Sequence, residues 1–332
     1  MSVTIKDVAR EAGVSVATVS RVLNGSAAVS EDTAENVNEV ISRLGYSPNC
    51  LGRNLRKRET RNILVIVPYI GHSLYSDIIK GIQDEASNEY DILVAAGYST
   101  VEIELRLLGM LTNHSVDAAV ILGSRVDAQT LDPLADRYNI ALCAENIEGS
   151  HTLTIMIDNR KAAKEVADRF IAAGKKRIGF VTTDDSIIAP SSTDRLAGYI
   201  ASLTEHGIPI RNEYIFKRDY DYKSGIQAAH DMMKLPEPPE AVLCISDLLA
   251  AGFIKGCNEI GAKVPDDVEV CGFDNISLCE MYTPMITTVS QPAYLMGRTT
   301  ARRLIDSLKT GIRSYGIEYL DYDVIVRESA SI

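Results

Sequence analysis

Acidic, aromatic and basic residues follow the short apolar segments of this chain, in the loops where strands would end. Arg195 in STDRLAGY and Asp274 in GFDN are two candidates for a binding site. A carboxylate can accept two hydroxyl hydrogen bonds and a guanidinium donates in a fork, so these groups around an aromatic platform suit a polyhydroxylated ligand. Equivalent loops add further candidates: Ser73, Tyr75, Arg125, Glu145, Asp158, Tyr220 and Asp247.

Two of these aspartates have a second interpretation. A carboxylate at the end of a strand can cap the helix that follows instead of contacting a ligand. Asp247, which precedes LLAAG, fits both interpretations. Asp158 can alternatively serve the segment that crosses between two lobes.

The apolar segments themselves predict an α/β body. Short, bounded apolar runs are typical of buried parallel strands, and helical patterns separate them. The first series has strands at 63–67, 92–95, 118–122, 141–143 and 154–157 and helices near 74–88, 101–113 and 127–138. The second has a helix near 160–173 and strands at 178–182, 214–217, 241–245 and 269–272. Two such series predict two doubly wound parallel-sheet lobes with a cleft between them, where ligands bind beyond the carboxyl ends of the strands.

The first sixty residues have a different pattern, which predicts three short helices. Thr4 can cap the first helix with Asp7 at its third position, close to a capping box. Gly13 supplies a turn and Ser15 caps the second helix. Ser30 caps the third. This arrangement is typical of a helix-turn-helix DNA-binding head.

The second helix is the one expected to meet DNA. Val19, Val22 and Leu23 form its inward stripe, which leaves Val16, Ala17 and Arg21 outward near the half that meets base edges. Arg21 can donate two hydrogen bonds to a guanine, and the two apolar residues can contact a thymine methyl. Short hydroxyl side chains suited to phosphates surround them: Ser15, Thr18 and Ser20.

Residues 47–61 predict a hinge. Ser47-Pro48 resembles a helix start, but the segment after it is short and contains Gly52 and Asn54, both poor helix formers. We expect it to be coil in free protein and helical on DNA. Leu55 would then be the apolar wedge that unstacks a base step in the minor groove, with Arg56 and its basic neighbours on the phosphates. The alternative is a plain solvated linker.

These motifs resemble those of LacI/GalR-type transcriptional regulators. The stretch T-I-x-D-V-A-x-x-A-G-V-S-x-x-T-V-S-R-V-L-N is close to the family's head signature, and Y-S-P-N-x-x-x-R-x-L resembles its hinge. The resemblance implies that positions 16, 17 and 21 read bases, that Leu55 intercalates, and that Asn24 and Tyr46 join the phosphate contacts. Gly52 stands where the family usually has alanine, which should make hinge folding costlier by roughly 1 kcal/mol.

The resemblance covers the whole chain and implies its domain organisation. The head would span 1–46, the hinge 47–61 and a body 62–332 of the type found in periplasmic binding proteins. The first lobe would comprise 62–158 and 291–316, and the second 159–290 and 317–332. The S-Q-P at 290–292 would be the last crossover before a first-lobe helix at 296–308.

Composition narrows the function class further. The net charge of −11 argues against nucleic acid as a partner, but residues 1–61 hold nine Lys or Arg against seven Asp or Glu, so a basic head can contact DNA on its own. The six cysteines show no CxxC and no zinc spacing, which predicts reduced, buried thiols and no metal. No catalytic motif and no cofactor motif is present, so we expect no enzyme and no cofactor. The absence of a signal peptide or apolar span predicts a cytoplasmic protein without membrane contact.

The predicted mechanism is linkage between two binding events. A homodimer would place two heads on the half-sites of a near-palindromic operator in double-stranded DNA. A small-molecule effector, favoured as a sugar or sugar derivative, would change the angle between the lobes and so the spacing of the hinges. Residues near 74–90 and 101–125 are the dimer-surface candidates by resemblance. In the alternative, a protein partner of the phosphocarrier kind controls the same DNA binder.

Overall fold

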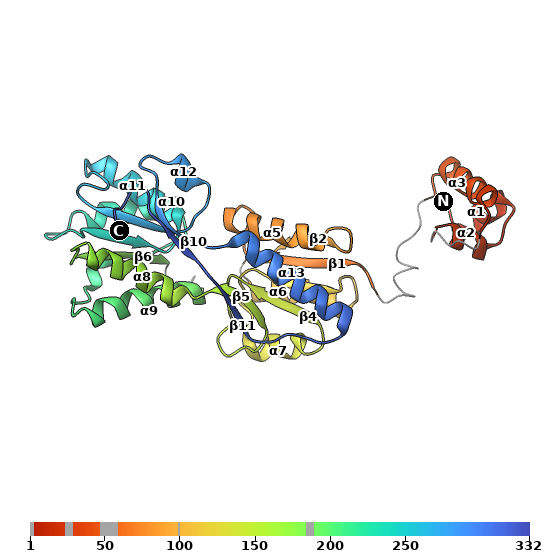
Figure 1. Ribbon diagram of the computed structural model, residues 1–332, viewed down its shortest axis with the longest axis horizontal. Helices are drawn as coiled ribbons and strands as arrows, with labels where there is room; N and C mark the ends of the chain where they lie inside the picture. Colours follow the sequence, from red (N-terminus) through yellow and green to blue (C-terminus); the bar gives the residue numbers. More distant parts are fainter. Residues whose placement is uncertain (1–2, 24–28, 47–58, 99, 184–188) are drawn as a thin grey trace. The chain divides into compact units, whose positions relative to one another are not determined.

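The computed structural model describes residues 3–23, 29–46, 59–98, 100–183 and 189–332. The chain divides into two compact units, a small head up to Glu59 and a body from Thr60 to Ile332 (Figure 1). The predicted hinge residues 47–58, Leu55 and Arg56 among them, lie outside the described residues, as does Asn24. No helix in the described ranges is long and apolar enough to cross a membrane.

The head consists of α1 (Ile5–Ala12), α2 (Val16–Leu23) and α3 (Glu31–Leu44). Val8, Val19 and Val37 are fully buried at the centre of the three helices. Because three short helices bury little apolar area, the head has only a small core to stabilise it.

The predicted helix starts in the head are confirmed. The backbone N–H and the hydroxyl of Thr4 both donate to Asp7 Oδ2, at 3.0 and 2.7 Å, and these bonds hold the pKa of Asp7 below its usual value. Ser15 Oγ accepts the Thr18 backbone N–H at 3.1 Å at the start of α2. Ser30 occupies the N-cap position of α3, but its hydroxyl pairs with the Thr33 hydroxyl instead of a backbone N–H.

The first lobe is built on a six-stranded sheet in the order β11-β5-β4-β3-β1-β2. Its strands pair in parallel. They are β1 (Asn62–Val67), β2 (Asp91–Ala96), β3 (Ala118–Ile121), β4 (Asn139–Cys143), β5 (Leu153–Ile157) and β11 (Ile317–Leu320). The helices of this lobe are α5 (Ser73–Ala86), α6 (Val101–Thr112), α7 (Ala128–Ala135) and α13 (Ala293–Thr310). Apolar clusters lie on both faces of the sheet, as expected for a doubly wound lobe.

The second lobe is built on a six-stranded sheet in the order β12-β10-β9-β8-β6-β7, in which only β12 is antiparallel to its neighbour. Its strands are β6 (Ile178–Thr183), β7 (Ile215–Arg218), β8 (Ala241–Cys244), β9 (Glu269–Asp274), β10 (Thr287–Ser290) and β12 (Asp323–Ile325). Its helices are α8 (Asn159–Ala172), α9 (Pro190–Glu205), a 3-10 turn at Asn212–Tyr214, α10 (Tyr222–Met232), α11 (Asp247–Ile260) and α12 (Leu278–Met281).

The chain passes between the lobes three times: after β5, between β10 and α13, and between β11 and β12. The predicted return to the second lobe at 317 is wrong, because β11 still pairs with β5 of the first sheet, from Ile317 opposite Thr154 to Leu320 opposite Ile157. The crossing therefore lies at 321–322. Figure 1 shows α13, from the C-terminal part of the chain, beside α5 of the first lobe.

Glycines bring three pairs of helices into close contact. The pairs are α5 with α13, α8 with α9, and α10 with α11. A Cβ on any of the following glycines would overlap the backbone of the partner helix: Gly81, Gly297, Gly198, Gly225 and Gly252. Close backbone approach therefore fixes how these helices lie on each lobe.

Candidate ligand site and nucleic-acid interface

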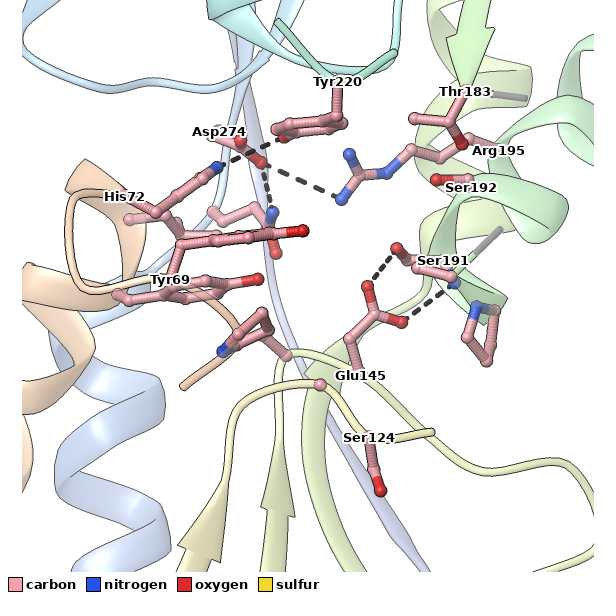
Figure 2. A pocket seen from close by; sticks show the side chains of 18 of the residues that line it. Tyr69, His72, Ser124, Glu145, Thr183, Ser191, Ser192, Arg195, Tyr220 and Asp274 are labelled. Carbon is pink, nitrogen blue, oxygen red and sulfur yellow. Dashed lines mark hydrogen bonds and ion pairs between the residues drawn. The ribbon is translucent and has the colours of Figure 1, made fainter. Parts of the chain in front are cut away.

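A cavity of about 340 Å³ lies between the two lobes (Figure 2). The first lobe lines it with the loops after β1, β3 and β4 and the start of α5, and the second with the ends of β6 and β9, the start of α9 and the loops after β7 and β10. These are loops at the carboxyl ends of strands, where open α/β sheets bind ligands. Six of the predicted ligand residues line it: Tyr75, Arg125, Glu145, Arg195, Tyr220 and Asp274.

Arg195 and Asp274 form the polar centre of the second-lobe wall. Arg195 projects from α9 and is only 6% exposed; its Nη2 lies 3.8 Å from Asp274 Oδ1. Its Nε donates to Asn159 Oδ1 at 2.8 Å, and its guanidinium lies 3.5 Å from the centre of the Phe273 ring. The cation is therefore locked in place, with one edge directed towards Asp274 (Figure 2).

The Asp274 carboxylate is held from a second side. Gln291 Nε2, from the segment after β10, donates to Asp274 Oδ1 at 2.6 Å. Burial raises the pKa of the Asp274 carboxyl even though Arg195 opposes this shift. Gln291 Oε1 is buried and has no hydrogen-bond partner among the described residues.

Aromatic rings form the wall between the lobes. His72 Nε2 lies 3.3 Å from the Tyr220 hydroxyl, and the His72 ring lies 4.6 Å from that of Tyr75 and 5.7 Å from that of Tyr220. Burial lowers the pKa of His72, so its imidazole is neutral at pH 7. Burial also raises the pKa of Tyr75 and Tyr220. These neutral rings, with Tyr69 close by, offer flat apolar faces (Figure 2).

Glu145 connects the two lobes. It follows β4 in the first lobe, and its carboxylate accepts the backbone N–H of Ser191 at 3.1 Å and the Ser191 hydroxyl. Ser191 stands in the first turn of α9, where free backbone N–H groups favour an anion. Burial nevertheless raises the pKa of Glu145.

Arg125 is positioned by a buried acid behind it. Glu104 of α6 accepts the Arg125 backbone N–H at 3.0 Å and the Ser124 hydroxyl at 2.7 Å. These bonds fix the loop that follows β3, so the loop presents Arg125 to the cavity.

Three predicted ligand residues are not among the residues that line the cavity. Ser73 is exposed at the start of α5, between two residues that do line it. Asp158 caps α8, where it accepts the Lys161 backbone N–H at 2.8 Å. Asp247 is fully buried behind the wall, where it accepts the Ile276 backbone N–H at 2.9 Å.

The helix-cap interpretation is wrong for Asp247, because Ser246 is the N-cap of α11. Asp247 also accepts a hydrogen bond from the Thr288 hydroxyl. Its carboxylate lies so close to Gly272 that a Cβ there would overlap it. Asp247 thus supports, from behind, the turn that carries Asp274.

The buried Asp247 carboxyl predicts a pH dependence of stability. Burial, with the nearby Asp274 charge, raises its pKa to about 7, above the value of about 3.9 expected in the unfolded chain. The folded protein therefore binds a proton on Asp247 that the unfolded chain has lost, and the contribution of this group to the free energy of unfolding falls as the pH rises from about 4 to 7. We expect Asp247→Asn to reduce this fall by at least about 1 kcal/mol, measured by urea unfolding at pH 5 and 7.5. If the free energy of unfolding changed equally between the two pH values in both proteins, the prediction would be contradicted.

Several lining residues were missed by the sequence analysis. Tyr69, His72, Thr183, Ser191 and Gln291 all line the cavity. His72 directly precedes the predicted Ser73, and Tyr69 lies two residues after the end of β1, so proximity to this strand end was an available signal. No such signal in the sequence pointed to Ser191 or Gln291, since only the packing of one lobe against the other brings them to the cavity.

The head presents the predicted DNA residues on its surface. Ser15, Val16, Ala17 and Arg21 are exposed, Val16 by 41%. The half-exposed residues Thr18, Ser20 and Tyr46 complete the predicted set within the described range. Tyr46 also packs against the small core of the head, so part of its ring has a structural role.

A helix-turn-helix head joined to a two-lobed body with a cleft defines a ligand-responsive DNA-binding regulator. The family model "Bacterial regulatory proteins, lacI family" matches residues 4–49, and the model "Periplasmic binding protein-like domain" matches 167–330. Catabolite control protein A of Priestia megaterium is 35% identical over 333 residues, covering 99% of each chain. The chain belongs to the lacI family of transcriptional regulators and is not an enzyme.

Two solved structures extend this likeness to the whole chain. The lac repressor dimer bound to operator and the anti-inducer ONPF is 26% identical, with a TM-score of 0.87 and 99% of both chains covered. The transcriptional regulator CelR in complex with cellobiose is 28% identical, with a TM-score of 0.73, and covers 99% of this chain and 100% of that one.

Proposed function

We propose that this regulator binds a near-palindromic operator as a homodimer and that an uncharged, hydroxylated molecule, a sugar or sugar derivative, controls it from the cavity. The observation that carries this proposal is the buried Arg195–Asp274 pair with Gln291 beside neutral aromatic rings. Fixed donors and acceptors recognise hydroxyl groups, and flat rings pack against the apolar face of a sugar. The complex of CelR with cellobiose supports this ligand class.

The charges around the cavity favour a neutral ligand over a phosphorylated one. Among the described lining residues, four carboxylates face two guanidinium groups: Glu145, Asp219, Asp221 and Asp274 against Arg125 and Arg195. Arg195 is already directed at Asp274, and Arg125 also has an interaction partner. A phosphate in the cavity would therefore meet more negative than positive charge.

The homodimer proposal is supported by exposed apolar residues on the first lobe. Leu93 and Val94 lie on β2, an edge strand of the sheet, and both are exposed. Val101 and Leu105 on α6 are exposed as well. Apolar residues on an edge strand and a neighbouring helix are typical of a protein–protein interface.

Thermal stabilisation of the full-length protein tests the ligand proposal. A panel would contain neutral sugars and glycosides, the matching sugar phosphates, and nucleosides. A ligand at a hundred times its Kd adds about 2.7 kcal/mol of stability. We expect neutral sugars to stabilise the protein and their phosphates not to. Stabilisation by phosphates or nucleosides alone would contradict the ligand class, and no stabilisation at all would favour control by a protein partner.

Arg21 is expected to contribute to sequence-specific binding. It is exposed on α2, and we propose that it contacts a base edge. Arg21→Ala should weaken binding to a duplex selected by the protein by about 1–3 kcal/mol and weaken binding to a scrambled duplex much less. Fluorescence anisotropy at one salt concentration measures both.

Arg10→Ala is the matched control in the same head. The Arg10 guanidinium is paired with Asp7 at 2.6 Å, so its loss should change binding to both duplexes little. Equal losses on the selected and scrambled duplexes after Arg21→Ala would show that Arg21 contacts phosphates only.

A further inference from the structure

One carboxylate holds the first residues of the body. Asp117, in the turn between α6 and β3, accepts the Thr60 backbone N–H at 2.8 Å and the Thr60 hydroxyl at 2.9 Å on Oδ1. Its Oδ2 accepts the Arg61 backbone N–H at 2.7 Å. The Asp117 backbone N–H donates to the Asn62 carbonyl at 2.9 Å. Two consecutive backbone donors and a hydroxyl thus converge on one side chain.

The backbone at this point has an unusual shape. Arg61 has a φ of +60°, a conformation that residues other than glycine rarely adopt. Its carbonyl accepts the Asp91 backbone N–H at 2.7 Å at the start of β2. The bonds to Asp117 on one side and to β2 on the other hold this turn against its conformational cost.

We propose that Asp117 is a positioning residue for DNA binding, because it fixes where and in which direction the chain leaves the first lobe towards the head. A movement of the lobes can change DNA binding by the head only if the segment that joins them transmits the movement. Without the hydrogen bonds to Asp117, Thr60 and Arg61 would rotate freely between the sheet and the head. The spacing of the two heads in a dimer would then be less defined. This inference rests on the proposed dimeric, lobe-controlled mode of binding.

The same contacts could serve only to stabilise the start of β1. In that case the loss of Asp117 would lower the stability of the body and leave operator affinity unchanged. The two roles are separated by a control that removes the same kind of contacts elsewhere in the first lobe. Asp132 accepts hydrogen bonds from the Ser150 hydroxyl, the His151 backbone N–H and the Thr152 hydroxyl, far along the chain from residue 60.

The experiment compares Asp117→Asn with Asp132→Asn in the full-length protein. The amide of each new side chain keeps the size of the carboxylate but places a donor where an acceptor is needed. We expect Asp117→Asn to weaken binding to the selected duplex at least tenfold, with little change on a scrambled duplex. Asp132→Asn should leave both affinities near those of the wild type, although both variants lose stability to a similar degree.

Hydrogen exchange of the Thr60 and Arg61 amides directly tests their hydrogen bonds to Asp117. We expect protection in the wild type and in Asp132→Asn and its loss in Asp117→Asn. Unprotected amides in the wild type, or equal operator affinities in the two variants, would overturn the proposal. None of these measurements needs a ligand, so failure of the ligand panel would leave this test intact.

Discussion

Asp274→Asn is expected to abolish the response of the protein to its ligand while leaving ligand-free binding to the selected duplex unchanged. The substitution keeps the size of the side chain, but it removes the charge that faces Arg195 and one of the two oxygen acceptors. Hydrogen bonds to charged groups contribute about 1.5–3 kcal/mol each, so affinity should fall by about 3 kcal/mol, a factor of a hundred or more. Isothermal titration with the best ligand of the panel measures the loss.

Asp158→Asn is the matched control for this experiment. Asp158 caps α8 and lies outside the cavity lining, and asparagine is as good an N-cap as aspartate. We expect normal ligand affinity and a normal response. If both variants lost affinity equally, or if Asp274→Asn bound ligand normally, the assignment of Asp274 as a ligand residue would be wrong.

Gly297→Ala is expected to destabilise the body by about 3 kcal/mol or more. The new Cβ on α13 would overlap the Ile78 carbonyl of α5 and reach within 3.0 Å of Ile82 N. Both neighbours are backbone atoms, which cannot rotate away, so the helices would have to separate and leave gaps in the core beneath them. Urea unfolding monitored by circular dichroism would measure the change.

The same substitution at Gly109 should not destabilise the protein. Gly109 lies inside α6, and a Cβ there meets no atom within 4 Å. Alanine is favoured over glycine in a helix by up to about 1 kcal/mol, so Gly109→Ala should be neutral or stabilising. Similar losses in the two variants would show that close helix contact is not what Gly297 provides.

The fold was largely predictable because the buried strands are short, apolar and bounded. Nine strands fell within a few residues of their predicted positions, including β3 and β8 at the centres of the two sheets. The strands β10, β11 and β12 were not predicted as strands. β10 is rich in threonine, and β11 and β12 are edge strands with exposed residues, so no uninterrupted apolar run marks them. The misplaced third crossing follows from the missing β11.

The candidate site was predictable only as far as strand ends reveal it. Arg195 and Asp274 were named as candidates, and both line the cavity. Asp247 shows the limit, since it lies close after a buried strand, but its carboxylate accepts hydrogen bonds from Thr288 and Ile276 behind the wall. Which way a side chain points depends on packing between distant segments, and a single sequence does not encode that in its local pattern.

Because the chain passes between the lobes three times, there are few places where such a protein can be divided into separate domains. A single cut removes the head, because one segment joins it to the body. No single cut separates the lobes, since at every crossing at least one of the two sheets has strands on both sides of it. Recombination at a single junction can therefore exchange the head between such regulators. At a single junction, a ligand-binding lobe cannot be exchanged without the other lobe.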